Sequence, residues 1–267
     1  MAIRTIFLMA QDCAAGNRDG WEEFVRDYAG ISARLIDQYF PGLSPQREQH
    51  MVGVFERARA NGNAWFAGLQ FSNEREFMMA FRDLLFAYCR DTAPAPAPQL
   101  SLDQFRDIVK DLAFVEREVL WLIIKGYSQQ QIPPILMNAA ATAEAVKKIA
   151  DERLARVIAG ASPEAFSASA RSLMEAAETM ATEQCVSLKT FNNIVNGQIT
   201  WREREIAEEH MADCFHCIDR FTTFLEMVRL RKDVGRMEED QRSRILTRLG
   251  FAAAKPKGML AKIFSRA

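Results

Sequence analysis

Apolar side chains recur at three- and four-residue steps along most of the chain, which predicts amphipathic helices. The clearest stripe predicts a helix that ends before Pro41-Gly42, and its members are Trp21, Phe24, Val25, Tyr28, Ile31, Leu35 and Tyr39. Two further stripes are Met51, Val54, Phe55 and Ala58, and then Phe77, Phe81, Leu84, Leu85 and Tyr88. No sustained strand alternation and no internal repeat interrupts this pattern. The sequence therefore predicts an all-α fold.

Two breaks divide the helical pattern. The stronger is TAPAPAPQLS at 92–101, where Pro alternates with Ala, a composition typical of an extended, semi-rigid linker. The weaker lies at 159–169, where small and polar residues surround Gly160 and Pro163. The predicted parts are a helical domain at 1–91, the linker at 92–101, a second domain at 102–160, a third at 164–250 and a basic tail at 251–267.

The apolar pattern of the middle domain predicts four short helices, at 101–112, 114–125, 128–136 and 142–158. Gly126 suits a sharp turn between the second and the third. The stretch ILMNAAATAEAVKK predicts helix, short turn and helix, which is the pattern of a helix-turn-helix. Helix pairs of this length are common, so the pattern alone does not establish DNA binding.

Composition and charge narrow the classes of protein. The 267 residues carry 34 Lys and Arg against 35 Asp and Glu, so charge alone cannot bind nucleic acid tightly. No apolar run approaches the ~18 residues of a membrane span, and no secretory signal is evident. We therefore expect a cytoplasmic protein with no firm membrane association. The chain shows no Gly-rich phosphate loop, no nucleophile elbow and no distinctive carboxylate pair, and we expect no enzyme.

Two stretches of the chain resemble bacterial extracytoplasmic-function sigma factors. The stretch AAGNRDGWEEFVRDYAGISARLIDQYF is similar to the opening helix of their region two. The stretch beginning LAFVEREVLWLIIKGYSQQQI is similar to their region four, with EREVL at 116–120 and Gly126-Tyr127-Ser128 in the family positions. The resemblance covers about residues 10–158. It implies a region-two helical bundle, a region-four helix-turn-helix, and binding to RNA polymerase core and promoter DNA.

The resemblance places a DNA-reading helix near residues 142–158. Lys147 and Lys148 are expected on its exposed face, and Arg153 and Arg156 towards the DNA backbone. The full expected DNA-binding set is Asn138, Thr142, Lys147, Lys148, Arg153 and Arg156.

The chain also departs from the family here. Ile149 and Glu152 stand where the family often places Arg, and Pro133-Pro134 fall in the first helix of the motif, where proline is tolerated only near the start. Two interpretations stay open. One is a working initiation factor, and the other is a degenerate sigma-like or anti-sigma protein that binds polymerase or a regulator without recognising a promoter.

The third domain contains the strongest local chemistry. His210 and Cys214 are one helical turn apart, and Cys217 follows three residues later. A turn near 214–217 would let both thiolates converge, and Cys185 could supply a fourth ligand from a preceding helix. Such a Cys₃His set suits a closed, structural Zn²⁺ site. The alternative is a group of free thiols without metal.

The remaining His and Cys residues near or outside this set are not expected to bind metal. His216 lies between the two cysteines, where a helical path points it away from them, and Cys13 and Cys89 are expected to be core thiols.

The same stretch, about 180–230, resembles the zinc-binding anti-sigma domain. Asn196-Gly197-Gln198-Ile199 stands in the place of the family's "DGEL", an acidic helix follows from Glu203 to Glu209, and His-x₃-Cys-x₂-Cys comes next. The resemblance implies a small helical domain that docks within the chain on the sigma-like domains and hides their polymerase-binding faces. Covalent fusion favours such docking through a high effective concentration. A thiolate-rich site also allows a second hypothesis, a redox sensor.

The basic tail combines positive charge with one apolar stripe. No acidic residue follows Asp240, and the tail contains Lys255, Lys257, Lys262 and Arg266 around Met259, Leu260, Ile263 and Phe264. Three interpretations stay open: a solvated terminus, docking on another helix or on polymerase, and weak binding to an anionic membrane surface.

Overall fold

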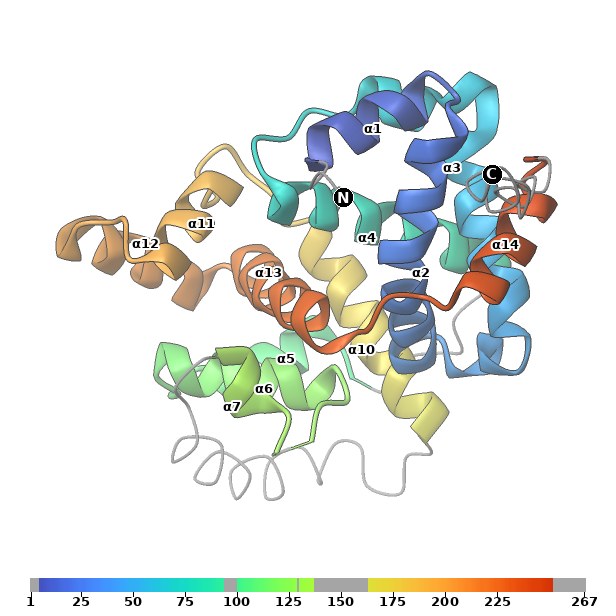
Figure 1. The fold of residues 1–267 in the computed structure, drawn as a ribbon. Helices are drawn as coiled ribbons and strands as arrows, with labels where there is room; N and C mark the ends of the chain where they lie inside the picture. The colour runs from blue at the N-terminus through green and yellow to red at the C-terminus, as the bar shows by residue number, and fades with distance from the viewer. Residues whose placement is uncertain (1–4, 94–99, 129, 137–162, 252–267) are drawn as a thin grey trace, which may run out of the picture. The chain divides into compact units, whose positions relative to one another are not determined.

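The computed structural model describes residues 5–93, 100–128, 130–136 and 163–251 (Figure 1). Within these residues every regular element is a helix, which confirms the predicted all-α class. The α-helices are α1 (Ile6–Ala14), α2 (Arg18–Tyr39), α3 (Arg47–Gly68), α4 (Glu74–Thr92), α5 (Leu102–Val109), α6 (Phe114–Ile124), α7 (Ile132–Leu136), α10 (Pro163–Glu178), α11 (Leu188–Asn196), α12 (Trp201–Asp213), α13 (Phe215–Asp233) and α14 (Glu239–Arg248), with a 3₁₀ helix η1 (Pro41–Gln46) after α2.

Most of the predicted helices lie where the apolar stripes place them. α2 ends at Tyr39, just before Pro41-Gly42, and α3, α4, α5 and α6 follow the next stripes. Gly126 adopts a left-handed φ of +87° after α6, which confirms the predicted turn. A Cβ atom there would lie 2.8 Å from the side-chain amide nitrogen of Gln38, the end of a flexible side chain that would have to shift, so the left-handed φ is the main reason for glycine at this turn.

Proline explains two differences from the predicted helices. α7 begins at Ile132, later than the predicted 128, so Pro133-Pro134 fall in its first turn, where no backbone N–H is required. The predicted break at 159–169 overlaps a helix from Pro163 onward, because Pro163 is the first residue of α10. The predicted helix at 142–158 and most of the Pro/Ala linker lie outside the described residues.

The chain forms two compact units, and the first combines distant segments: Met1–Gly30, Glu48–Leu69 and Gly235–Ala267. Trp21 and Phe24 pack edge-to-face on Phe66, with ring centroids 5.3 and 5.0 Å apart. The backbone N–H of Met237 donates to the carbonyl of Arg26 at 3.0 Å. The segment that contains α14 therefore packs with N-terminal helices in this unit, although it follows the predicted zinc-binding stretch. The predicted domain boundaries rest on the sequence alone and stay a prediction.

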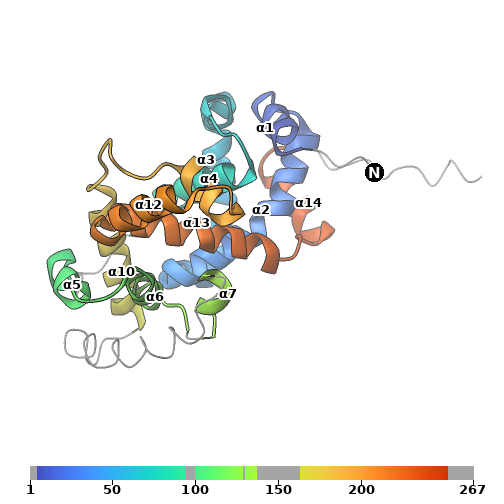
Figure 2. The same cartoon turned by 90° about the vertical axis from the view of Figure 1, so that its left-hand side faces the viewer.

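The second unit comprises Ile31–Arg47 and Gln70–Val234 and is organised around α13. Side chains on all sides of α13 are buried, which is typical of a central helix. α13 packs against α4, α6, α7, α10 and α12. Both views show α6 and α7 along one side of it (Figures 1 and 2). No helix in the described part of the chain is both long and apolar enough to span a membrane.

Candidate metal centre

Two helix ends and one turn bring four soft ligands together. His210 lies in the last turn of α12, and Cys217 lies in the first turn of α13. Cys214 joins the two helices with an extended backbone (φ −105°, ψ 104°), so the chain turns between the ligands as predicted. Cys185 lies in the turn before α11, not in a helix. This corrects the expected position of Cys185 but keeps it in the ligand set.

The sequence positions these elements through local capping. Thr200 begins α12 with a capping box: its hydroxyl accepts from the N–H of Glu203, and the Glu203 carboxylate accepts from the N–H of Thr200 at 3.0 Å. Gly197, with φ +67°, ends α11 at the predicted "DGEL" position. The order of helix end, cap and acidic helix thus follows the expected pattern.

The spacing of the four ligand atoms fits one metal ion. Ligand atoms of Cys185, His210, Cys214 and Cys217 all lie within 4.8 Å of one another. The sulfur atoms of Cys185 and Cys214 are 3.9 Å apart, whereas a disulfide requires ~2.05 Å. Zinc–sulfur bonds of ~2.3 Å in a tetrahedron place two sulfur ligands about 3.8 Å apart. These four residues are close enough to bind a metal ion.

One unsatisfied atom supports the same conclusion. The Nε2 atom of His210 is buried and has no hydrogen-bond partner in the structure. A buried polar atom without a partner is destabilising unless something binds it. Coordination by a metal would satisfy this nitrogen.

Backbone groups around the cluster favour thiolate ligands. The N–H of Thr182 donates to Cys185 Sγ at 3.2 Å, and the N–H of Val186 donates to Cys217 Sγ at 3.3 Å. Burial raises the pKa of Cys185, but the hydrogen bonds from Thr182 outweigh it, and the pKa falls to about 7. Burial raises the pKa of Cys214 and of Cys217. In the absence of a cation, these three thiols would therefore not all ionise readily.

The other candidate ligands lie apart from the metal centre. His216 is not in the cluster, and burial lowers its pKa, followed by the charge of Arg220. Cys13 and Cys89 are fully buried free thiols, as expected for core residues. The six predicted DNA-binding residues, from Asn138 to Arg156, lie outside the described residues, so that expectation stays a prediction.

A buried ion network beside the metal centre was not predicted from sequence. Lys125 Nζ lies 3.2 Å from Asp219 Oδ1 and 3.6 Å from Glu226 Oε2, and all three side chains are buried. Burial raises the pKa of Asp219, but the charges of Lys125 and then Arg82 outweigh it and lower the pKa. The available signal was two acidic residues seven positions apart on α13, a helix otherwise rich in apolar residues.

Comparison with known proteins identifies no relative of this chain. No protein-family model matches the chain, and no curated protein or solved structure that was compared with it matches either.

Proposed function

We propose that this chain is a sigma-like regulator of transcription initiation, which binds RNA polymerase core and promoter DNA and is controlled in cis by its metal-binding segment. We further propose that the metal is Zn²⁺, because three thiolates and one imidazole form a typical closed zinc shell. One observation carries the proposal: the metal-binding segment and the region-four-like helices share a buried core.

The first part of this shared core lies between α6 and the junction of α12 with α13, where three of the four candidate metal ligands lie. Arg117, within the family-like EREVL stretch, donates to the carbonyl of Ala212, between His210 and Cys214. The rings of Trp121 and Phe215 stack with centroids 5.9 Å apart. A movement of the metal ligands would therefore disturb the contacts that α6 makes through Arg117 and Trp121.

The second part is the buried ion network, where α6 meets the middle of α13. Trp121 Nε1 donates to Asp219 Oδ1 at 3.0 Å, and Lys125 Nζ donates to Thr223 Oγ1 at 2.8 Å. Buried charges are strongly destabilising when one partner is lost. These paired groups therefore favour one specific arrangement of α6 on α13.

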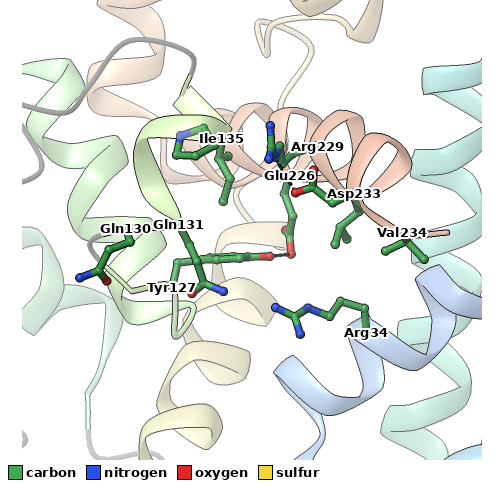
Figure 3. Close-up of a pocket in the computed structure, with 11 residues that line it drawn as sticks. Arg34, Tyr127, Gln130, Gln131, Ile135, Glu226, Arg229, Asp233 and Val234 are labelled. Carbon is green, nitrogen blue, oxygen red and sulfur yellow. Dashed lines mark hydrogen bonds and ion pairs between the residues drawn. The ribbon is translucent and has the colours of Figure 1, made fainter.

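The third part lies where the residues after α6 and helix α7 approach the end of α13. Tyr127 and Tyr39 both donate to the carboxylate of Glu226, and Figure 3 shows Tyr127 directed at Glu226. A cavity of about 420 Å³ lies beside this pair and is also lined by Arg34 and Ile135. Polar contacts to Glu226 therefore join this end of the interface, together with the buried side chains of Ile132 and Ile135.

Partly exposed ion pairs join α13 to α4, in the region-two-like part of the second unit. Arg220 Nη1 lies 2.9 Å from Asp83 Oδ2, and Arg231 Nε lies 2.8 Å from Glu74 Oε1. One helix thus contacts segments similar to both sigma regions. The resemblance implies that these segments bind polymerase, so docking of α13 would compete with that binding.

The proposal is tested by weakening the docked state without introducing a buried unpaired charge. In the full chain, Arg220→Glu with Arg231→Glu replaces two attractive pairs by repulsion. If docking is inhibitory, a loss of ~1.4 kcal/mol from the docked state raises the open population about tenfold. We expect binding to bacterial RNA polymerase core to tighten by a similar factor, measured by fluorescence anisotropy.

The matched control restores one pair in reverse. Adding Glu74→Arg to the same chain re-forms the second pair and should recover part of the change in polymerase binding, whereas Asp83 is kept because it also pairs with buried Arg82. If neither the wild type, nor the double variant, nor the zinc-depleted chain binds core polymerase, the proposed function is wrong.

The alternative without promoter recognition has its own supporting observation. Pro133-Pro134 are two of the five residues of helix α7, and Ile132 and Ile135 are buried. In a helix-turn-helix the first helix positions the DNA-reading helix, and a helix of five residues offers little surface for that packing. Equal affinity of the polymerase-bound double variant for promoter and scrambled DNA would favour this alternative, and selective promoter binding would favour the initiation factor.

A further inference from the structure

The cavity beside Tyr127 and Glu226 lies entirely within the second unit. It is lined by Arg34 of α2, by the residues just before α7, by α7 itself and by the last two turns of α13 (Figure 3). Cavities that bind small organic molecules have volumes of ~300–1,000 Å³. At about 420 Å³, this cavity is therefore large enough for a small ligand.

Part of the cavity wall is aliphatic. Ile135 and Leu230 are buried there, and Pro134 and Val234 extend the same apolar surface. Of the described residues that line the cavity, only Tyr127 is aromatic, and its hydroxyl already donates to a carboxylate. An aliphatic chain would bury its surface against this wall without needing an aromatic ring to stack on.

Four charged side chains also line the cavity, and three of them already have partners. Asp233 Oδ2 lies 2.5 Å from Arg229 Nε. The carboxylate of Glu226 lies 3.6 Å from Lys125 Nζ and accepts hydrogen bonds from two tyrosine hydroxyls. The fourth is Arg34, which is exposed at the edge of the cavity with its guanidinium directed into it (Figure 3). It makes no ion pair or hydrogen bond with any residue that the structure describes.

We propose that this cavity binds a small aliphatic carboxylate, with the carboxylate group on Arg34 and the chain along Ile135, Leu230 and Val234. A guanidinium group binds a carboxylate through two parallel hydrogen bonds. One unpaired cation matches the single negative charge of a carboxylate, whereas a phosphate ester would bring about two negative charges close to Glu226. Binding of such a ligand does not require that the chain binds polymerase.

Octanoate is the probe, and isothermal titration calorimetry of the full chain measures its affinity. We expect a dissociation constant on the order of 0.1–1 mM, as for other ligands of about ten non-hydrogen atoms. Acetate lacks the aliphatic chain, and octylammonium carries the opposite charge on the same chain. Both should bind at least ~tenfold more weakly than octanoate, because each loses one of the two expected contacts.

Substitution of Arg34 tests the carboxylate contact. Arg34→Met keeps an unbranched stem without the charge and should weaken octanoate binding at least ~tenfold, whereas Arg34→Lys should retain most of the affinity. The matched control is Arg202→Met, which removes an exposed arginine of α12 that does not line the cavity. It should leave the affinity unchanged. Thermal melts followed by circular dichroism confirm that each variant is folded.

Methyl NMR of the wild-type chain locates the ligand without any substitution. Octanoate should shift the methyl resonances of Ile135, Leu230 and Val234, and should leave that of Val54, which is buried on α3, unchanged. The proposal is overturned if octanoate does not bind, or if octylammonium binds equally well. Unchanged affinity in Arg34→Met would overturn it too, and so would resonance shifts confined to methyl groups outside the cavity.

Discussion

The metal centre and the buried ion network differ in how far apart in the sequence their residues lie. Three of the four metal ligands, His210, Cys214 and Cys217, come from one short stretch, whereas Lys125 is nearly a hundred residues from its partners Asp219 and Glu226. The metal centre follows from helix geometry and spacing. The network exists only because α6 packs on α13.

The two sites also stabilise the fold differently. The metal centre is only partly buried. Its protein groups do not satisfy one another, because the buried Nε2 atom of His210 has no hydrogen-bond partner. The ion network is complete within the chain, since each charge has an opposite charge and a hydrogen bond. Damage to the network should therefore destabilise the folded state directly, and damage to the metal centre should act through loss of metal.

The largest expected effect comes from Lys125→Met, which leaves Asp219 and Glu226 buried without their cation. We expect the free energy of unfolding to fall by about 3–5 kcal/mol, measured by denaturant titration. Lys189→Met, at an exposed position, is the matched control and should have little effect. Bound metal per folded chain should not change, and a loss of metal in Lys125→Met would show that the two sites are coupled.

The next effect comes from Cys214→Ser, which removes a central ligand of the metal centre. Metal analysis should show one Zn²⁺ per wild-type chain and almost none in the variant. In free zinc a hundredfold above the dissociation constant, the loss should lower stability by about 2.7 kcal/mol. Cys89→Ala removes a core thiol and should keep the metal. Unchanged metal content in Cys214→Ser would show that the ligand assignment is wrong.

A pH-dependent effect concerns the carboxyl of Glu118, which is buried on α6. Burial, followed by the charge of Glu208, raises its pKa from 4.5 to about 8. The folded state therefore binds more protons than the unfolded state, and stability should fall as the pH rises from about 4.5 to about 8. Glu118→Gln should be more stable than the wild type by ~1.4 kcal/mol for each pH unit above the unfolded-state pKa within this range, and similar to it at the lower end.

Glu56 offers the matched control for that substitution. Glu56→Gln removes a carboxyl at an exposed position away from α6 and tests whether the loss of any one carboxyl gives the same change. If Glu118→Gln shows the same slope of stability against pH as the wild type, another group is responsible.

The smallest effect comes from Arg220→Ala, which breaks one exposed pair with Asp83. Exposed ion pairs contribute ~0–1 kcal/mol, so stability should decrease by less than ~1 kcal/mol, and 1 M salt should remove the difference. A larger loss than that of Lys125→Met would reverse the order inferred from burial.

Several features of this protein are determined by the sequence alone, because they depend on residues within one or two helical turns of each other. The apolar stripes predict α2, α4 and α6, the acidic stretch from Glu203 to Glu209 predicts a helix that lies within α12, and the His-x₃-Cys-x₂-Cys spacing predicts three metal ligands. Backbone hydrogen bonds and side-chain neighbours in a helix are local, so sequence spacing is enough to identify them.

Only the tertiary structure decided which distant segments meet. It placed the thiol of Cys185 in a turn beside Cys214, paired Lys125 with Asp219, and packed the segment around Met237 with N-terminal helices. These contacts close long loops and depend on the combined packing of many side chains. No short stretch of sequence contains that information, which is why the metal centre was largely predictable and the buried ion network was not.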